Sequence, residues 1–116
     1  MILREFLKSK INNASVTAKQ LKYQGSIGID KNILDQADIL PGERVQVLNY
    51  NNGSRIETYV IEEEKGSKKI ILYGPAARCG EAGDKLCILS YCLVSEDSLG
   101  KNTHRVVQLS AGNELE

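Results

Sequence analysis

The chain has 116 residues, enough for a single domain (1–116) around one hydrophobic core, and its 15 Lys and Arg balance 15 Asp and Glu. The formal net charge of zero argues against nucleic acid as the main partner, because phosphate binding depends on a basic surface. No apolar run approaches the roughly 18 residues of a membrane span, and the first residues lack the apolar core of a signal peptide, so we expect a cytoplasmic protein with no membrane partner.

The first part of the chain is expected to form a strand, a turn and a short helix. The strand covers residues 1–10, and the Asn-Asn-Ala sequence at 12–14 is typical of a turn. Asp30 is a suitable N-cap for a helix that continues through Ala37. Pro41-Gly42 is expected to end this helix.

The middle of the chain predicts a β-hairpin. A strand at 43–49 and a return strand at 54–61 flank the turn sequence Asn51-Asn52-Gly53. The charged stretch at 62–69 is expected to be a solvated turn.

The rest of the chain adds three strands, at 70–73, 86–94 and 105–109. Between the first two, the loop Gly74-Pro75-Ala76-Ala77-Arg78 has the small residues that suit a close approach of a ligand to the backbone. Many short strands with one small helix indicate an all-β barrel rather than a parallel sheet with helical crossovers.

Cysteine and histidine usage predicts neither a disulfide nor a metal site. The cysteines Cys79, Cys87 and Cys92 are odd in number and lack a Cys-x-x-Cys spacing, so reduced and mostly buried thiols are expected. The one histidine, His104, lies in a polar tail without a second candidate ligand. Glycine-rich nucleotide-binding motifs are also absent, so the chemistry must come from ordinary side chains or from a group made out of the chain itself.

The Gly25-Ser26 peptide bond is a candidate source of such a group. Glycine leaves its carbonyl carbon unshielded and permits unusual backbone angles. In a strained geometry the Ser26 hydroxyl can attack that carbonyl and turn the amide into an ester. Elimination and hydrolysis would then split the chain into 1–25 and 26–116 and leave a pyruvoyl group in place of Ser26. Taken alone, this dipeptide is far more often an ordinary turn before a strand.

Candidate binding and proton-transfer groups lie on the return strand of the hairpin. Strand alternation places Arg55 and Tyr59 on one face and Thr58 on the other. Arginine suits a carboxylate and a phenol can pass a proton, although such residues are more often simply half-exposed. Lys10 adds a second cation. Arg55 and Thr58 can serve one site only through a bulge or a neighbouring subunit.

The order of several segments resembles the aspartate alpha-decarboxylase family, pyruvoyl enzymes that make β-alanine for pantothenate and coenzyme A. The resemblance covers residue 1 to about residue 96, and its motifs are weak singly but specific together. The matching segments are Leu7-Lys8-Ser9-Lys10-Ile11, Val16-Thr17, Tyr23-Gln24-Gly25-Ser26-Ile27-Gly28-Ile29-Asp30, Asn52-Gly53-Ser54-Arg55-Ile56-Glu57-Thr58-Tyr59 and Gly74-Pro75-Ala76-Ala77-Arg78.

The resemblance implies a six-stranded double-psi β-barrel that assembles as a homotetramer with active sites between subunits. It implies autocatalytic cleavage of a zymogen between Gly25 and Ser26, and a covalently bound pyruvoyl group derived from Ser26, with no metal and no pyridoxal phosphate. The amine of L-aspartate would form a Schiff base with the pyruvoyl ketone, which accepts the electron pair left by the departing carbon dioxide. No motif identifies a helper protein for maturation.

The same resemblance implies a role for each matched residue. Ser26 and Tyr59 would be catalytic, with Tyr59 as the proton donor. Processing would involve Gly25 and Ser26, with Tyr23 beside the bond and Thr58 positioning it. Substrate would be bound by Lys10, Arg55, Thr58, Gly74, Pro75 and Ala76.

Three positions depart from the family pattern. Tyr73 stands where asparagine is usual, Pro75 replaces a common alanine, and Asn12 replaces a common histidine. Because Tyr73 removes an amide that can both donate and accept, we expect slower self-cleavage or a narrower pocket. Pro75 is expected only to stiffen its loop.

Two other interpretations stay open. The chain could keep the barrel uncleaved, as a non-enzymatic binding or structural unit, which the departures at 12, 73 and 75 favour. It could also be a DNA-binding β-barrel of the swapped-hairpin type, which the zero net charge and the acidic run at 62–64 disfavour.

Overall fold

The computed structural model describes residues 1–116 and is built mainly of β-strands, so the predicted all-β class is confirmed. The strands are β1 (Leu3–Ser15), β2 (Ala18–Gln20), β3 (Ser26–Asp30), β4 (Arg44–Asn49), β5 (Arg55–Glu63), β6 (Ile70–Tyr73), β7 (Lys85–Ser95), β8 (Arg105–Ser110) and β9 (Glu114–Leu115). The helices are α1 (Lys31–Ala37) and three short 3-10 helices, η1 (Gly74–Cys79), η2 (Glu96–Ser98) and η3 (Ala111–Asn113).

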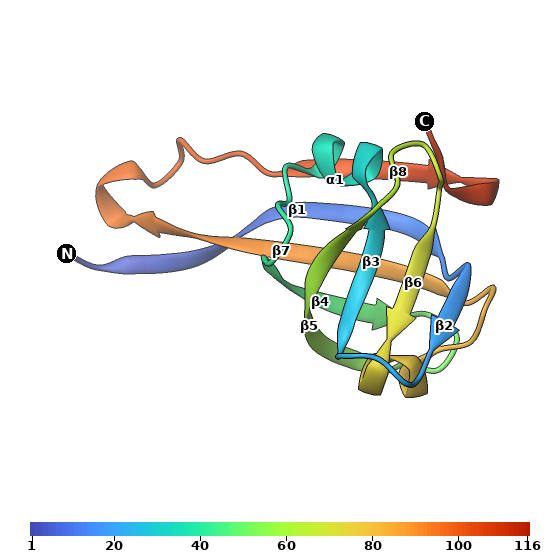
Figure 1. The fold of residues 1–116 in the computed structure, drawn as a ribbon. Helices are drawn as coiled ribbons and strands as arrows, with labels where there is room; N and C mark the ends of the chain where they lie inside the picture. The colour runs from blue at the N-terminus through green and yellow to red at the C-terminus, as the bar shows by residue number, and fades with distance from the viewer.

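The strands hydrogen-bond in the order β2-β6-β3-β5-β4-β7-β1-β8-β9. The pairs β1–β8, β2–β6 and β3–β5 are parallel, and the others are antiparallel. In Figure 1, β1, β7 and β8 run together and cross the direction of β3, β5 and β6, so the sheet curls around its apolar face. Fully buried side chains from both parts fill the enclosed core, including Ile27 of β3, Ile11 of β1 and Ile88 of β7. The double-psi type of barrel stays a prediction.

The N-terminal end of β1 and the far end of β7 extend past this core as a two-stranded arm, visible at the side of Figure 1 where the N-terminus lies. Its pairing runs from Leu3↔Ser95 to Leu7↔Tyr91. Apolar side chains on the arm are exposed, among them Leu3 and Leu93. None of the chain's helices could span a lipid bilayer, since the longest, α1, has 7 residues.

Asp30 is the N-cap of α1, as predicted, and its buried carboxylate has three backbone partners. Oδ1 accepts from the N–H of Asn32 at 2.8 Å and of Gly66 at 2.9 Å, and Oδ2 accepts from the N–H of Lys68 at 2.7 Å. The side chain therefore joins β3, α1 and the turn after β5. The helix ends at Ala37, before Pro41-Gly42, because Asp38 takes the left-handed conformation at φ 56°.

Other boundaries predicted from the sequence are wrong. β1 continues through the expected turn at 12–14, and a register shift between Ile11 and Ala14 absorbs Asn13 at φ 62° as a bulge. Glu62 and Glu63 extend β5, because they continue its parallel ladder with β3 instead of opening a turn. The expected loop at 74–78 is the helix η1. The hairpin of β4 and β5 and the strands at 70–73, 86–94 and 105–109 are confirmed within a few residues.

Candidate active site

The Gly25-Ser26 bond lies at the point where β3 begins. Ser26 is fully buried and is paired with Tyr73 of β6 in the antiparallel ladder. Its Oγ donates a long hydrogen bond, 3.4 Å, to the carbonyl oxygen of Gln24. The hydroxyl therefore faces back along the chain, toward the segment that ends in the Gly25 carbonyl.

The first residues of η1, Gly74 and Pro75, lie very close to the backbone of residues 23–25. Gly74 has φ 63°, and a Cβ on it would lie 2.5 Å from the carbonyl oxygen of Tyr23 and 2.8 Å from the nitrogen of Gly25. Only glycine fits such an approach and such a φ. A Cβ on Gly25 would in turn lie 3.2 Å from Cδ of Pro75. The backbone ahead of Ser26 is thus confined by the start of η1.

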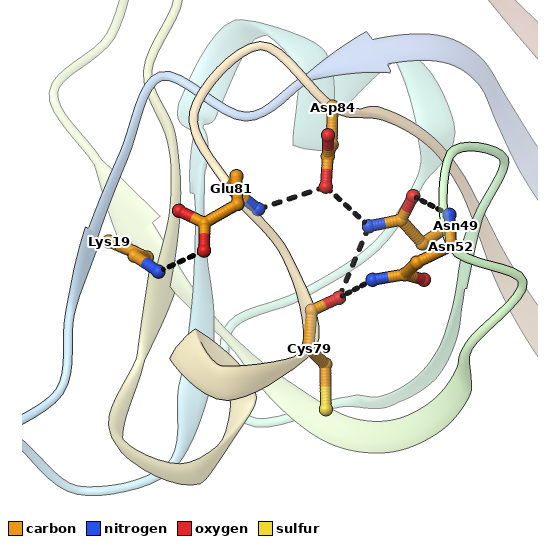
Figure 2. Close-up of polar contacts among 6 residues, drawn as sticks. All are labelled: Lys19, Asn49, Asn52, Cys79, Glu81 and Asp84. Atoms are coloured by element: carbon orange, nitrogen blue, oxygen red, sulfur yellow. Dashed lines mark hydrogen bonds and ion pairs between the residues drawn. The ribbon is translucent and has the colours of Figure 1, made fainter.

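The other end of η1 is held by the turn of the β4–β5 hairpin. The carbonyl oxygen of Cys79 accepts from Nδ2 of Asn49 at 3.1 Å, Nδ2 of Asn52 at 3.0 Å and Oγ of Ser54 at 3.3 Å. In Figure 2 both amides converge on this carbonyl while the Cys79 sulfur points away. Because Asn49 is buried, the hairpin fixes the end of η1 at a well-shielded point.

Asp84 completes this network. Its Oδ2 accepts from Nδ2 of Asn49 at 3.0 Å and from the N–H of Glu81 at 2.9 Å (Figure 2). These two hydrogen bonds lower the pKa of the Asp84 carboxyl, and the bond from Asn49 has the larger effect. Glu81 also forms an ion pair with Lys19 of β2 at 2.7 Å, so β2, the turn before β7 and η1 are joined.

A cavity of about 430 Å³ opens beside the bond. Thr58 and Tyr59 both line it, and neither hydroxyl makes a side-chain hydrogen bond within the chain. Ser26 and Gly74 are buried and do not line the cavity. The full lining is Gly25, Ile56, Glu57, Thr58, Tyr59, Pro75, Ala76 and Cys79.

The two predicted carboxylate-binding residues lie elsewhere. Register pairs β5 with β4 without a break from Leu48↔Arg55 to Arg44↔Tyr59, so no bulge turns Arg55 toward Thr58. Neither Lys10 nor Arg55 lines the cavity. Within one chain, the structure therefore brings together Gly25, Thr58, Tyr59, Pro75 and Ala76 but leaves the two cations apart from them.

Lys10 and Arg55 have a common neighbour in Cys87. Leu48 of β4 pairs with Arg55 on one side and with Cys87 on the other, and the Cys87 Sγ lies 3.5 Å from Oδ1 of Asn12 on β1. Burial raises the pKa of the Cys87 thiol, while the charges of Lys10 and Arg55 act to lower it. Both cations therefore act on one region of the β1-β7-β4-β5 sheet. All three cysteines are free thiols, and no group of three metal-ligating side chains occurs in the chain.

Tyr73 is engaged with Glu63, a residue that the sequence did not single out. The phenol donates to Oε2 of Glu63 at 2.8 Å, and its ring packs on that of Tyr23 with 4.7 Å between centroids. The pKa of Tyr73 is raised to about 12. Burial has the largest effect, and the hydrogen bond to Glu63 has the second largest. Tyr73 does not line the cavity, and its effect on self-cleavage stays a prediction. No sequence signal pointed to Glu63, because it lies in an acidic run that is typical of a solvated turn.

Comparison with known proteins gives a consistent family. The sequence matches the aspartate decarboxylase family model over residues 2–116. A protein of Staphylococcus epidermidis named aspartate 1-decarboxylase is 47% identical over 114 residues, which cover 98% of this chain and 89% of that protein. Proteins of the same name from Thermoanaerobacter pseudethanolicus and Syntrophomonas wolfei are 47% and 45% identical, and the matches cover 95% and 98% of this chain and 94% and 97% of theirs.

Proposed function

Because the chain belongs to the aspartate decarboxylase family, we propose that it converts L-aspartate to β-alanine and carbon dioxide with a pyruvoyl group made from Ser26. Family membership makes the chain a decarboxylase, a carbon–carbon lyase. The pyruvoyl part of the proposal is supported chiefly by one observation. The backbone of Gly74 confines Tyr23 and Gly25 directly ahead of a buried serine hydroxyl.

The self-cleavage that we propose uses only groups of the chain and water. Oγ of Ser26 attacks the carbonyl carbon of Gly25, the carbon–nitrogen bond breaks, and the freed amine takes a proton, which leaves an ester. Loss of the Cα proton of Ser26 then expels the Gly25 carboxylate. Water hydrolyses the remaining unsaturated amine to a ketone and ammonia. The products are residues 1–25 and residues 26–116 with a pyruvoyl end.

The residues around the bond fit a pyruvoyl group at position 26. The group would sit at the start of β3 next to the cavity, where Gly25, Pro75 and Ala76 leave space for a small substrate. When present, it supplies an electron-accepting ketone. The Tyr59 hydroxyl, which has no partner within the chain, would deliver a proton to the substrate carbon after carbon dioxide leaves. Thr58 would position the bond before cleavage and contact substrate afterwards.

The substrate carboxylate that is retained requires a cation that this cavity lacks. Lys10 and Arg55 have the right chemistry, and arginine can bind a carboxylate with two parallel hydrogen bonds. We therefore propose that these two residues reach the cavity of a neighbouring subunit in a homotetramer. The exposed apolar arm of β1 and β7 supports assembly, because such side chains are commonly covered in oligomers. We also propose that the protein is located in the cytoplasm.

Two variants test the assignment. Ser26→Ala should give a folded, unsplit chain that releases no carbon dioxide from aspartate. Tyr59→Phe should split normally but lose most of its turnover, by about a hundredfold if the phenol is the acid. Intact mass spectrometry and carbon dioxide release measure both. Decarboxylation by Ser26→Ala would overturn the cofactor assignment, and normal turnover by Tyr59→Phe would remove that residue as proton donor.

A further inference from the structure

A row of three side chains crosses strand β3 beside the Gly25-Ser26 bond. Glu63 comes from β5 and Tyr73 from β6, the two strands that flank β3. Their hydrogen bond passes over Gly28, where a Cβ would lie 2.0 Å from Oε2 of Glu63 and 2.9 Å from Cε2 of Tyr73. Tyr23 then packs on the ring of Tyr73 at an interplanar angle of 41°. The missing side chain of Gly28 makes room for this row.

The segment that carries the bond has few other attachments. Residues 21–24 are exposed, and the only backbone hydrogen bond made by residues 21–25 outside regular structure is internal, from the N–H of Tyr23 to the carbonyl of Leu21. η1 limits this segment on one side through Gly74 and Pro75. Apart from the long hydrogen bond from Ser26 Oγ to the Gln24 carbonyl, the ring of Tyr23 on Tyr73 is its other anchor.

Glu63 in turn determines where the ring of Tyr73 lies. A phenol bound to a carboxylate makes a stronger hydrogen bond than a neutral pair, and both side chains are half-buried, so the bond is partly shielded from water. Tyrosine at 73 offers both the ring for Tyr23 and the hydroxyl for Glu63. An asparagine at this position would offer neither the ring nor the reach.

We propose that Glu63 is a positioning residue for the Gly25-Ser26 bond: it holds Tyr73, and Tyr73 clamps the Tyr23 segment over Ser26. This inference rests on the proposed self-cleavage for its effect on rate, but the clamp itself does not. The residues of the clamp are Glu63, Tyr73 and Tyr23, and none of them reacts.

The clamp is tested in the unsplit Ser26→Ala chain, where self-cleavage plays no part. Lys22 lies in the clamped segment, and trypsin cuts after lysine, so the rate of cutting there reports how often the segment opens. Glu63→Ala and Tyr73→Phe should each raise this rate about tenfold, as expected for one lost charge-assisted hydrogen bond. Glu63→Gln keeps an acceptor but loses the charge, so its rate should lie between those of the parent and Glu63→Ala.

Tyr91→Phe is the matched control, because it removes another phenol hydrogen bond of 2.8 Å, to Gln46, away from this segment. It should leave cutting at Lys22 unchanged. An unchanged rate in Glu63→Ala would overturn the clamp. So would faster cutting at every lysine and arginine together with a lower melting temperature, since that pattern means general destabilisation.

The positioning role is tested with Ser26 in place. Freshly purified Glu63→Ala should split about ten times more slowly than the parent, Glu63→Gln should lie between the two, and Tyr91→Phe should split at the parental rate. The sequence led us to expect slower splitting with tyrosine than with asparagine at 73, and the clamp predicts the reverse. Tyr73→Asn should split more slowly than the parent, and faster splitting of that variant would contradict the clamp. If even the parent never splits while the trypsin result holds, the proposed self-cleavage fails and the clamp of the segment stands.

Discussion

At the scale of single residues, Gly74 sets the geometry of the bond that we expect to break. Its positive φ and the 2.5 Å from its Cβ position to the Tyr23 carbonyl are two separate demands, and each excludes a side chain. Gly112 also has a positive φ, 71°, but nothing lies within 4 Å of its Cβ position, so a side chain there would meet no steric overlap. Comparing substitutions at Gly74 and Gly112 therefore distinguishes the cost of backbone strain from the cost of steric overlap.

Gly112→Ala should lower the free energy of unfolding by about 1 kcal/mol, the usual cost of a left-handed alanine. Gly74→Ala should cost at least twice as much and should also leave the chain unsplit, because the segment ahead of Ser26 must move. Urea unfolding and intact mass measure the two effects. Equal behaviour of the two variants would show that the close approach at Gly74 has no consequence.

Tyr73 makes stability depend on pH in the alkaline range. Its pKa is raised to about 12 in the folded protein, above the ordinary value of 10.0, so the folded state holds this proton more tightly than the unfolded state. The resulting stability is fully present below pH 10 and is lost as pH rises from about 10 to about 12. The stability of the parent should therefore fall more steeply over this range than that of Tyr73→Phe. Urea unfolding at a series of pH values measures the difference, and identical slopes would contradict the pKa shift.

At the scale of elements, η1 links the hairpin turn to the cleavage site. Its first residue touches the segment ahead of Ser26, and its last carbonyl is held by Asn49, Asn52 and Ser54. A short 3-10 helix has little stability of its own, so these contacts at both ends determine its place.

The buried amide of Asn49 should matter more than the exposed amide of Asn52, although both donate to Cys79. Asn49→Ala should lower the free energy of unfolding by about 2 kcal/mol and Asn52→Ala by less than about 1 kcal/mol, because buried groups lose more when a partner is removed. Asn49→Asp should be worse than Asn49→Ala, since it places a carboxylate against the Cys79 carbonyl and Asp84. Chemical unfolding checks this order, and equal costs for Asn49→Ala and Asn52→Ala would contradict it.

Elements with a local cause were predictable from the sequence. The Asp30 cap and the Asn-Asn-Gly turn depend on neighbours a few residues away, and the structure has both. The bulge at Asn13 and the extension of β5 to Glu63 depend on strands that are distant in sequence, so local turn propensity gave the wrong result there.

In the candidate site too, some residues were predictable from the sequence and others depend on strands that are distant in sequence. Thr58, Tyr59, Pro75 and Ala76 lie together beside Gly25 as the family resemblance implies. Glu63 was missed, because its contact with Tyr73 exists only once β5 and β6 flank β3. The separation of Arg55 from Thr58 followed from strand alternation alone, and the unbroken register confirms it.

At the scale of the whole molecule, the two halves of the chemistry lie in different parts of one chain. Gly25 and the proposed acid Tyr59 line the cavity, while Lys10 on β1 and Arg55 at the start of β5 do not. The site shared between subunits that we propose would reconcile these positions.

Mixed oligomers test the shared site. Arg55→Ala and Tyr59→Phe chains should each be nearly inactive alone and should recover activity when co-expressed, because some sites then combine an intact cavity with an intact arginine. Ser26→Ala mixed with Tyr59→Phe is the control and should stay inactive, since both changes damage the cavity. No recovery in the first mixture would mean that each chain builds its whole site alone.

The most direct test follows splitting and decarboxylation together in one ageing sample of the unaltered protein. Intact mass gives the fraction of chains divided between Gly25 and Ser26, and carbon dioxide release from L-aspartate gives the activity. The two should rise in proportion, with a ketone-reactive end on the fragment that starts at position 26. Full activity in an unbroken chain, or complete splitting without gas release, would contradict the proposal that the protein makes its electrophile from its own backbone.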